Sequence, residues 1–541
     1  MSHDKGFRSL IIIFLCFFLL MNLAACIKAP QESGQFSYNT LIFDKFQQNE
    51  EDITKYLVTD EVAEYCDIDL FIDATKSMQG FVRLRTPGLY EEVLQKLEEI
   101  SLLAFKDHVF SYYRFWDKPE EISRELFRQS AFTADFYESY HAPDDNNPAN
   151  TNLVNVFNNI ASNYGDMSDK ELKNQMSVVV TDMVSTSESD RIEMVKTLNE
   201  SFLRRGMSIA LIGIKAQYNG RVYDIVADGA SYRFDYEGIR PYYLLLIGSL
   251  PNLRSYLEKF NQTFSNLFPD KKESLLIFSH LLTVREDTGR AALNWDESYE
   301  DPFINAIAAQ HFFSPSLLND PDIQTTETYR FFHDLVFELP ELSTPAGTIT
   351  FNNPFASDPE SVLRLADWEL SARVEVIRGR EVHPSTGELL DDNQGAQAVI
   401  TDANNMLSTG DPVLKSNNQR IDVDIMFNMK KMQKDMAYLV RVDLYGKPVV
   451  MERNIPDWIN QWTMDLTGLA EWQQDPGTFE GHTTPYLNAL IGTLWKKAAA
   501  DSMEYPNLHM GSATIGVLCA EYTDMELRKR CLDAIDERKQ K

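Results

Sequence analysis

The pattern of apolar and polar positions differs between parts of the chain. Over residues 61–267, short apolar runs alternate with stretches of helical periodicity. The clearest apolar run is Tyr65 to Asp73, in which Ile68, Leu70 and Ile72 occupy alternate positions. Leu89 to Phe105 follows with apolar residues at helical spacing. Strands that alternate with helices predict an α/β fold, here a doubly wound, mostly parallel sheet.

The remaining elements of this part continue the alternation. Tyr218-Asn219-Gly220-Arg221 is typical of the turn of an extra hairpin. Arg240-Pro241 precedes a strongly apolar run, and we interpret the pair as a device that protects a sheet edge. The pattern predicts further strands over residues 107–116, 176–182, 207–214 and 241–247, and helices over residues 153–164, 187–205 and 251–264.

From about residue 271 the apolar positions recur at every second residue. This period predicts antiparallel strands, and we expect a β-rich, sandwich-like domain over residues 271–475. Residues 476–541 are expected to form a C-terminal helical segment, with helices over 486–497 and 524–538. The strands of the β-rich domain are expected at residues 346–351, 368–377, 420–427 and 436–445.

The first 25 residues have the composition of a secretory signal. Basic residues precede an apolar run that is too short to span a bilayer as a helix. The run ends in Leu23-Ala24-Ala25-Cys26, which resembles the processing box of bacterial lipoproteins. The resemblance implies lipidation of Cys26, a tether over residues 26–60, and anchoring to the cell membrane or the outer membrane. Ordinary secretion with an unmodified Cys26 is the alternative.

Oxygen-bearing side chains follow two of the predicted buried strands. Asp73, Thr75 and Ser77 lie at alternate positions just after the first strand, and Asp182 ends the strand M-S-V-V-V-T-D. Thr151 lies where a helix is predicted to begin. The carboxyl ends of parallel strands share one edge of a sheet, which is where ligands bind in open α/β folds.

This order of motifs resembles a von Willebrand factor type A domain with its metal-ion-dependent adhesion site. The resemblance covers residues 61–267 and implies that Asp73, Thr75, Ser77, Thr151 and Asp182 hold a metal ion. The family pattern has serine where this chain has Thr75, which keeps the hydroxyl. The site would take Mg²⁺, or Ca²⁺ or Mn²⁺, because hard cations prefer oxygen ligands. A protein partner would complete the coordination shell with a carboxylate.

Two other interpretations of the same residues remain open. Asp73, Thr75 and Ser77 could instead cap the helix that begins near Leu89, or hold their own loop in place. The site could also be a decayed one on an intact fold. The loop over residues 141–150 precedes Thr151 and would rim the site, either as a specificity element or as a plain surface loop.

The composition of the chain argues against one class of partner and suggests a role for each remaining cysteine. The 541 residues carry a formal charge of −30, which argues against binding to nucleic acid. Of the five cysteines, Cys66 is expected to be a thiol in the core. Cys519 and Cys531 could form a disulfide, or remain two free thiols.

An enzyme and a glycan-binding module are the competing functional hypotheses. The chain contains no H-E-x-x-H, G-x-S-x-G or phosphate-loop motif. A phosphatase-like hydrolase could use Asp73 as its nucleophile, but Thr75 stands where such enzymes have a second aspartate. Trp458, Trp462 and Trp472 could stack on sugars, although we expect them to lie in the core. The sequence therefore favours a lipid-anchored envelope protein that binds a protein partner and is not an enzyme.

Overall fold

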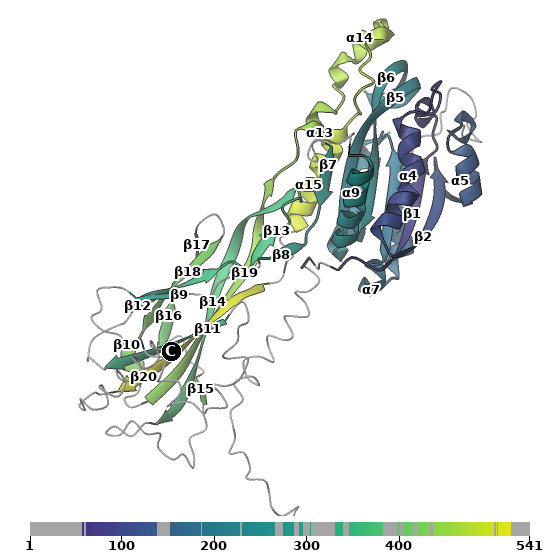
Figure 1. Cartoon of the computed structure of the whole chain (residues 1–541). Coiled ribbons are helices and arrows are strands. Elements are labelled where there is room, and N and C mark those ends of the chain that lie inside the picture. Colours follow the sequence, from purple (N-terminus) through teal and green to yellow (C-terminus); the bar gives the residue numbers. More distant parts are fainter. Residues whose placement is uncertain are drawn as a thin grey trace, which may run out of the picture.

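The computed structural model has an α/β unit at one end and a β-rich unit at the other, joined by long strands (Figure 1). It describes residues 57–58, 61–137, 152–184, 187–227, 230–265, 274–285, 292–295, 303–304, 330–338, 346–381, 398–400, 405–415, 419–432, 436–501, 505 and 507–520. Several predictions fall outside these residues: the signal and the tether with Cys26, the loop at 141–150, Thr151, Cys531 and the helix over 524–538.

The α/β unit is built on a seven-stranded mixed sheet. Its α/β character is confirmed, but only the pairs of β1 with β2 and with β4 are parallel, so the predicted mostly parallel order is wrong. The reason is that β6 pairs with β5 as a hairpin and also with β4, antiparallel on both sides. The strand order is β3 (Pro119–Ile122), β2 (Asp107–Phe115), β1 (Tyr65–Asp73), β4 (Gln175–Thr181), β6 (Ala230–Gly248), β5 (Ser208–Ala227) and β7 (Leu275–Phe278).

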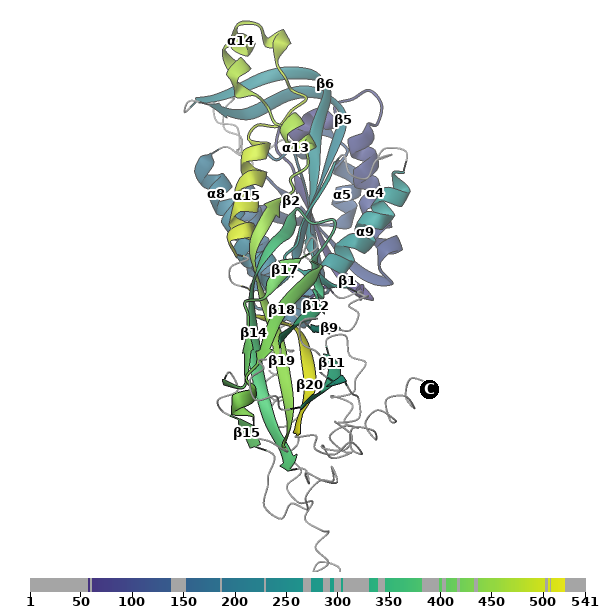
Figure 2. The ribbon, with the colours of Figure 1, turned by 90° about the vertical axis from the view of Figure 1, so that its left-hand side faces the viewer.

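Helices cover both faces of this sheet, which explains why β1 is apolar on both sides. Ile68, Leu70 and Ile72 pack into the cluster that includes α4 (Leu89–Ala104) and α9 (Leu250–Thr263). Phe71 packs into the opposite cluster with α6 (Leu153–Gly165) and α8 (Glu188–Thr197). Figure 2 shows α4, α5 (Arg124–Ser130) and α9 on one side of the sheet and α8 on the other. A short helix, α7 (Asp169–Leu172), precedes β4.

The β5–β6 hairpin is longer than the sequence pattern predicts. Tyr218 to Arg221, expected to be a turn, lies inside β5 and pairs with residues 235–238 of β6. The strands remain paired as far as Ala227 and Ala230. Pairing of β6 with β4 ends at Tyr243, so the rest of the hairpin extends beyond the sheet. In Figure 2 it arches over the end of the unit.

The β-rich unit contains two larger sheets that share one hydrophobic cluster, as a sandwich-like domain requires. Strand β11 pairs parallel with β20, whereas the other strand pairs described in the two sheets are antiparallel. One sheet contains β10 (Phe303–Ile304), β11 (Arg330–Glu338), β20 (Leu508–Ala520), β19 (Met436–Arg453), β14 (Leu363–Glu381) and β15 (Ala398–Ile400); the other contains β16 (Leu407–Thr409), β17 (Val413–Lys415), β18 (Arg420–Phe427), β12 (Ala346–Asn352) and β9 (Ala292–Trp295). A separate pair consists of β8 (Leu282–Val284) and β13 (Phe355–Ser357).

Segments from the second half of the chain complete the α/β unit. The predicted helix near residue 486 is present as α15 (Leu487–Asp501), and it packs on the sheet face that contains Phe71. Strand β7 lies beyond the predicted boundary at residue 267, yet it belongs to the first sheet. The predicted C-terminal helical segment also contains strand β20, so that expectation is wrong over residues 508–520.

Buried aromatic and thiol side chains agree with the expected core assignments. Trp458 and Trp472 are buried, and Trp462 packs against the same core as Trp458, with their rings 5.0 Å apart. Cys66 is fully buried as a free thiol, as predicted. Within the described residues, no helix combines the length and the apolarity needed to cross a membrane.

His280 provides a prediction about stability and pH. Burial lowers the pKa of His280 to about 4, and its Nε2 has no partner within the described part of the chain. The unfolded chain binds a proton near pH 6.5 that the folded state does not bind, so the contribution of His280 to stability is full above pH 6.5 and falls towards pH 4. Relative to His280→Gln, the parent protein should lose about 1.4 kcal/mol for each pH unit in this window. Urea unfolding at pH 7 and pH 5 measures it.

In this experiment, His280→Gln should remove the extra pH dependence. The variant His482→Gln, at an exposed position, serves as the control and should behave like the parent protein. An equal dependence on pH in the parent and in His280→Gln would contradict the assignment.

Candidate metal site

The turn after β1 brings three oxygen-bearing side chains together. The backbone N–H and the Oγ1–H of Thr75 both donate to Asp73 Oδ1, at 3.0 and 2.6 Å. Thr75 Oγ1 and Ser77 Oγ are 3.0 Å apart. All three residues are buried. The turn therefore gathers Asp73, Thr75 and Ser77 into one hydrogen-bonded cluster.

Strand β4 brings a second carboxylate beside this cluster. Parallel pairing aligns Ile72 of β1 with Val180 of β4, so both strands end together. Thr181 donates from Oγ1 to Asp73 Oδ2 at 2.8 Å, and Asp182 follows directly. Burial and the nearby charge of Asp182 raise the pKa of Asp73 to about 7, against the hydrogen bonds from Thr75 and Thr181.

Arg240 of β6 is the cation of the site. Its Nη2 donates to Asp182 Oδ2 at 3.1 Å, and both side chains are fully buried. Its Nη1 donates to the carbonyl of Gly481 at 3.2 Å, and its guanidinium lies 5.5 Å from the ring centre of Tyr218. Arg240 thus contacts the site. Pro241 lies past the end of β4, where β6 is paired with β5 alone. The predicted protection of a sheet edge therefore fits Pro241 but not Arg240.

The backbone beside Asp182 is strained. Met183 has a φ of 58°, one of two positive values among the described non-glycine residues. This conformation costs of order 1–3 kcal/mol and persists only where its surroundings impose it. Met183 N donates to Thr181 Oγ1 at 3.1 Å, and Val184 N donates to Asp182 Oδ1 at 3.3 Å. The strained turn thereby fixes Thr181 and Asp182 next to Asp73.

Residues 463–486, which we call the cap, fold over the β5–β6 hairpin. The cap contains α14 (Leu469–Gln474) and follows α13 (Trp458–Gln461). Its ends are held together because Met464 N donates to the carbonyl of Thr484 at 2.9 Å. Phe479 stacks on Phe234 of the hairpin, with ring centres 4.6 Å apart. The cap reaches the site through Gly481, whose carbonyl accepts from Arg240.

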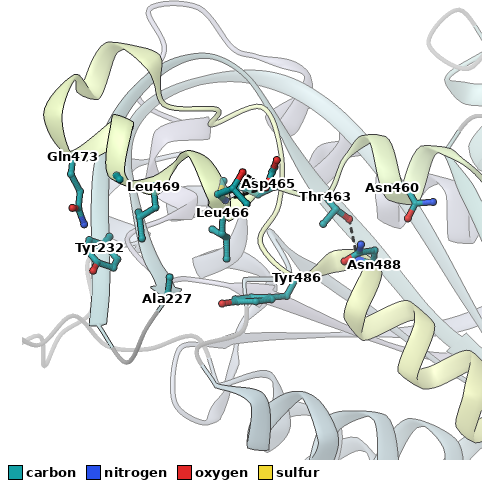
Figure 3. Close-up of a pocket in the computed structure, with 13 residues that line it drawn as sticks. Ala227, Tyr232, Asn460, Thr463, Asp465, Leu466, Leu469, Gln473, Tyr486 and Asn488 are labelled. Carbon is teal, nitrogen blue, oxygen red and sulfur yellow. Dashed lines mark hydrogen bonds between the residues drawn. The ribbon is translucent and has the colours of Figure 1, made fainter.

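A hollow of about 850 Å³ separates part of the cap from the hairpin. In Figure 3, Leu466 and Leu469 of the cap point towards Ala227 and Tyr486 across this space. Tyr486, where the cap joins α15, has the second positive φ, also 58°. The cap is thus fixed near Gly481 and Phe479 but packs incompletely around the hollow.

The structure tests the helix-capping interpretation and shows which residues the sequence pattern missed. Helix α4 begins at a Gly88 cap supported by Glu91, so Asp73, Thr75 and Ser77 do not cap it. They do hold their own turn in place. Thr151, the fifth predicted ligand, lies outside the described residues.

Thr181 and Arg240 were missed as members of the site. Thr181 was visible within the strand motif V-V-V-T-D, directly before Asp182. Arg240 gave a weaker signal, a lone cation just before an apolar strand. Its contact with Asp182 depends on the pairing of β6 with β4, which the sequence did not reveal.

The side chains of this cluster fit a hard cation better than a soft one. Two carboxylates and two hydroxyls are oxygen ligands of the kind that Mg²⁺ and Ca²⁺ prefer. Among the residues described, no group of three or more His, Cys, Asp or Glu side chains is placed to hold a metal. Hydroxyl oxygens would therefore have to supply part of any coordination shell at Asp73 and Asp182.

Thr181→Val should destabilise the protein without removing a predicted metal ligand. The change deletes the donor to Asp73 Oδ2 and leaves a buried carboxylate oxygen unsatisfied. Urea unfolding should show a loss of about 1–3 kcal/mol. Thr493→Val, at an exposed position of α15, is the matched control and should change stability little. Equal stability of the two variants would show that the Thr181 hydrogen bond contributes nothing.

Comparison with known proteins provides no relative for this chain: no family model, no curated protein and no solved structure matches it. Inferences about function therefore depend on the residues of the site itself.

Proposed function

We propose that this protein is a lipid-anchored protein of the cell envelope that binds a protein partner through a divalent cation. In this proposal the α/β unit is a doubly wound module of the von Willebrand factor type A kind. Asp73, Thr75, Ser77 and Asp182, together with Thr151, hold Mg²⁺, or Ca²⁺ or Mn²⁺. The cation in turn binds a carboxylate of the partner.

The observation that carries the proposal is the charge of the buried cluster. Asp73 and Asp182 are both fully buried, and Arg240 forms an ion pair with Asp182. Within the described ranges, no cationic side chain forms an ion pair with Asp73. Two carboxylates and one guanidinium therefore leave one negative charge when all are ionised. Buried charge is costly unless it is paired, and a divalent cation would give Asp73 the cationic partner that it lacks among the described residues.

The position of the cluster supports binding as well. Asp73 and Asp182 follow the carboxyl ends of adjacent parallel strands, the edge at which open α/β sheets bind ligands. Five protein side chains would leave at least one of the six positions around Mg²⁺ to water, which an incoming carboxylate can replace. The chemistry is coordination without a bond-breaking step.

The hydrogen bonds of Asp73 and the packing of the tryptophans weigh against the two competing hypotheses. A nucleophilic Asp73 would need contact with substrate, but both of its oxygens accept hydrogen bonds within the buried cluster. The tryptophans considered for sugar stacking are packed in the core. The envelope location depends on the N-terminal motif and Cys26, so it is proposed from the sequence alone.

Replacing both carboxylates should abolish stabilisation by metal. With Mg²⁺ at a hundredfold excess over its Kd, we expect the parent protein to gain about 2.7 kcal/mol, visible as a rise in Tm. Asp73→Asn with Asp182→Asn should show no rise. The control Asp67→Asn with Asp69→Asn changes two carboxylates of the same strand β1 and should keep the response. A Mg²⁺ response that survives the first double substitution would contradict the site.

Capture of a partner tests the second half of the proposal. The lipidated full-length protein, used as bait in solubilised envelope, should retain a protein that chelator releases and that the Asp73→Asn, Asp182→Asn variant does not retain. Retention that is the same with chelator and in the variant would show that binding does not depend on the metal.

A further inference from the structure

Arg240 connects the candidate site to the cap. One guanidinium group donates to Asp182 from Nη2 and to the carbonyl of Gly481 from Nη1. Its side chain is fully buried, and Nε–H has no acceptor among the residues that the structure describes. Buried arginine donors are normally all satisfied, so one donor without an acceptor is a cost that this arrangement retains. The group is therefore placed next to Asp182 without being optimally bonded there.

We propose that Arg240 is an internal cation that competes with the divalent ion for Asp182 and holds the cap closed over the site. Metal binding then displaces Arg240 and loosens the cap, which opens the site to the partner. This inference depends on the proposed function, because it describes how the same metal site is regulated.

Charge balance explains the competition. With both carboxylates ionised and Arg240 present, the cluster carries one negative charge, and adding a divalent ion would leave one positive charge. Only when Arg240 leaves do one divalent ion and two carboxylates balance. In a buried site, where charges interact strongly, the neutral combination is favoured. Arg240 and the metal are therefore expected to exclude each other from the vicinity of Asp182.

The geometry of the cap explains how displacement would be transmitted. Arg240 cannot leave Asp182 without changing its bond to Gly481, because both bonds belong to one planar group. Gly481 itself is tightly placed, since a Cβ there would lie 2.4 Å from the ring of Tyr236. Trp472 and Phe479 hold the cap on the hairpin, whereas the hollow of about 850 Å³ leaves the side of the cap that faces Ala227 without close packing. Incomplete packing of this kind favours local opening.

The cap holds Arg240 beside predicted ligands that are themselves buried. Asp73, Thr75, Ser77 and Asp182 are all buried, although a partner carboxylate must reach the metal. The hydroxyl of Tyr243 in β6 donates a hydrogen bond to Thr484 Oγ1 of the cap at 3.0 Å, which strengthens the closed arrangement. An opening step is therefore required before the partner can bind, and displacement of Arg240 provides one.

Two variants weaken the arginine contact in different ways. Arg240→Gln removes the competing cation. Gly481→Ala leaves every site residue intact but forces the cap away from Tyr236, which should disturb the Gly481 carbonyl. Gly477→Ala is the control, because it lies in the exposed part of the same cap and a Cβ there meets only Asp475 Oδ1 at 3.2 Å.

Titration with Mn²⁺, followed by electron paramagnetic resonance of the free ion, measures the competition. Arg240→Gln and Gly481→Ala should bind Mn²⁺ more tightly than the parent protein by roughly 5- to 150-fold, the usual range for coupled sites. Gly477→Ala should bind like the parent. If Arg240→Gln does not fold, as judged by circular dichroism, Gly481→Ala carries the test. Unchanged affinity in the variants that fold would overturn the inference.

Hydrogen exchange measures the effect on the cap. Linkage is reciprocal, so Mn²⁺ should speed the exchange of the Met464 and Thr484 amides, which close the cap at its ends. The response should be absent from the Asp73→Asn, Asp182→Asn variant. Exchange that does not respond to Mn²⁺ in a protein that binds the ion would overturn the coupling while leaving the proposed function intact.

The affinities also separate this inference from the proposed function. Binding of Mn²⁺ by Arg240→Gln but not by the parent would support the role of Arg240 and overturn metal-dependent binding in the native protein. Absence of binding in the parent and in every variant would overturn both.

Discussion

The structure of the candidate site depends on balancing the charges of two carboxylates that are buried at the ends of β1 and β4. Asp73 and Asp182 are fully buried, and among the described residues Arg240 forms an ion pair with Asp182 but not with Asp73. Taking carboxylates out of water is costly, and hydrogen bonds from Thr75 and Thr181 offset only part of that cost. Two further unfavourable features lie next to Asp182: the backbone strain at Met183 and the Arg240 Nε–H without an acceptor among the described residues. Such concentrations of unfavourable terms mark functional sites more often than structural ones.

Three separate parts of the chain supply the environment of this cluster. The parallel pair β1 and β4 aligns the carboxylates, the hairpin strand β6 brings Arg240, and the cap supplies the Gly481 carbonyl. Because the hairpin continues past the end of β4, it offers the surface on which the cap packs through Phe234 and Phe479. The extension of β5 and β6 therefore positions Arg240 and also supports the cap.

Local patterns predicted the elements well and the long-range pairing poorly. The apolar run that ends at Asp73 and the helix after Gly88 were recognisable because each depends on its own residues. The convergence of Asp73, Thr75 and Ser77 was likewise a property of one turn. Arg240 could not be predicted, because its place depends on β6 pairing with both β4 and β5. The period-two pattern revealed the β-rich unit but not the return of α15 to the first sheet.

The packing of α15 on the first sheet has a consequence for folding during synthesis. Leu490, Ile491 and Leu494 of α15 cover a face of a sheet whose first strand ends at Asp73. During synthesis this apolar surface stays uncovered after the last strand of the sheet, β7, has emerged, because 208 residues lie between β7 and α15. Nascent chains in that state are prone to aggregate, so a holding chaperone would benefit this protein more than one whose domains finish in succession. A shortened product that stops before α15 would carry the bare surface permanently.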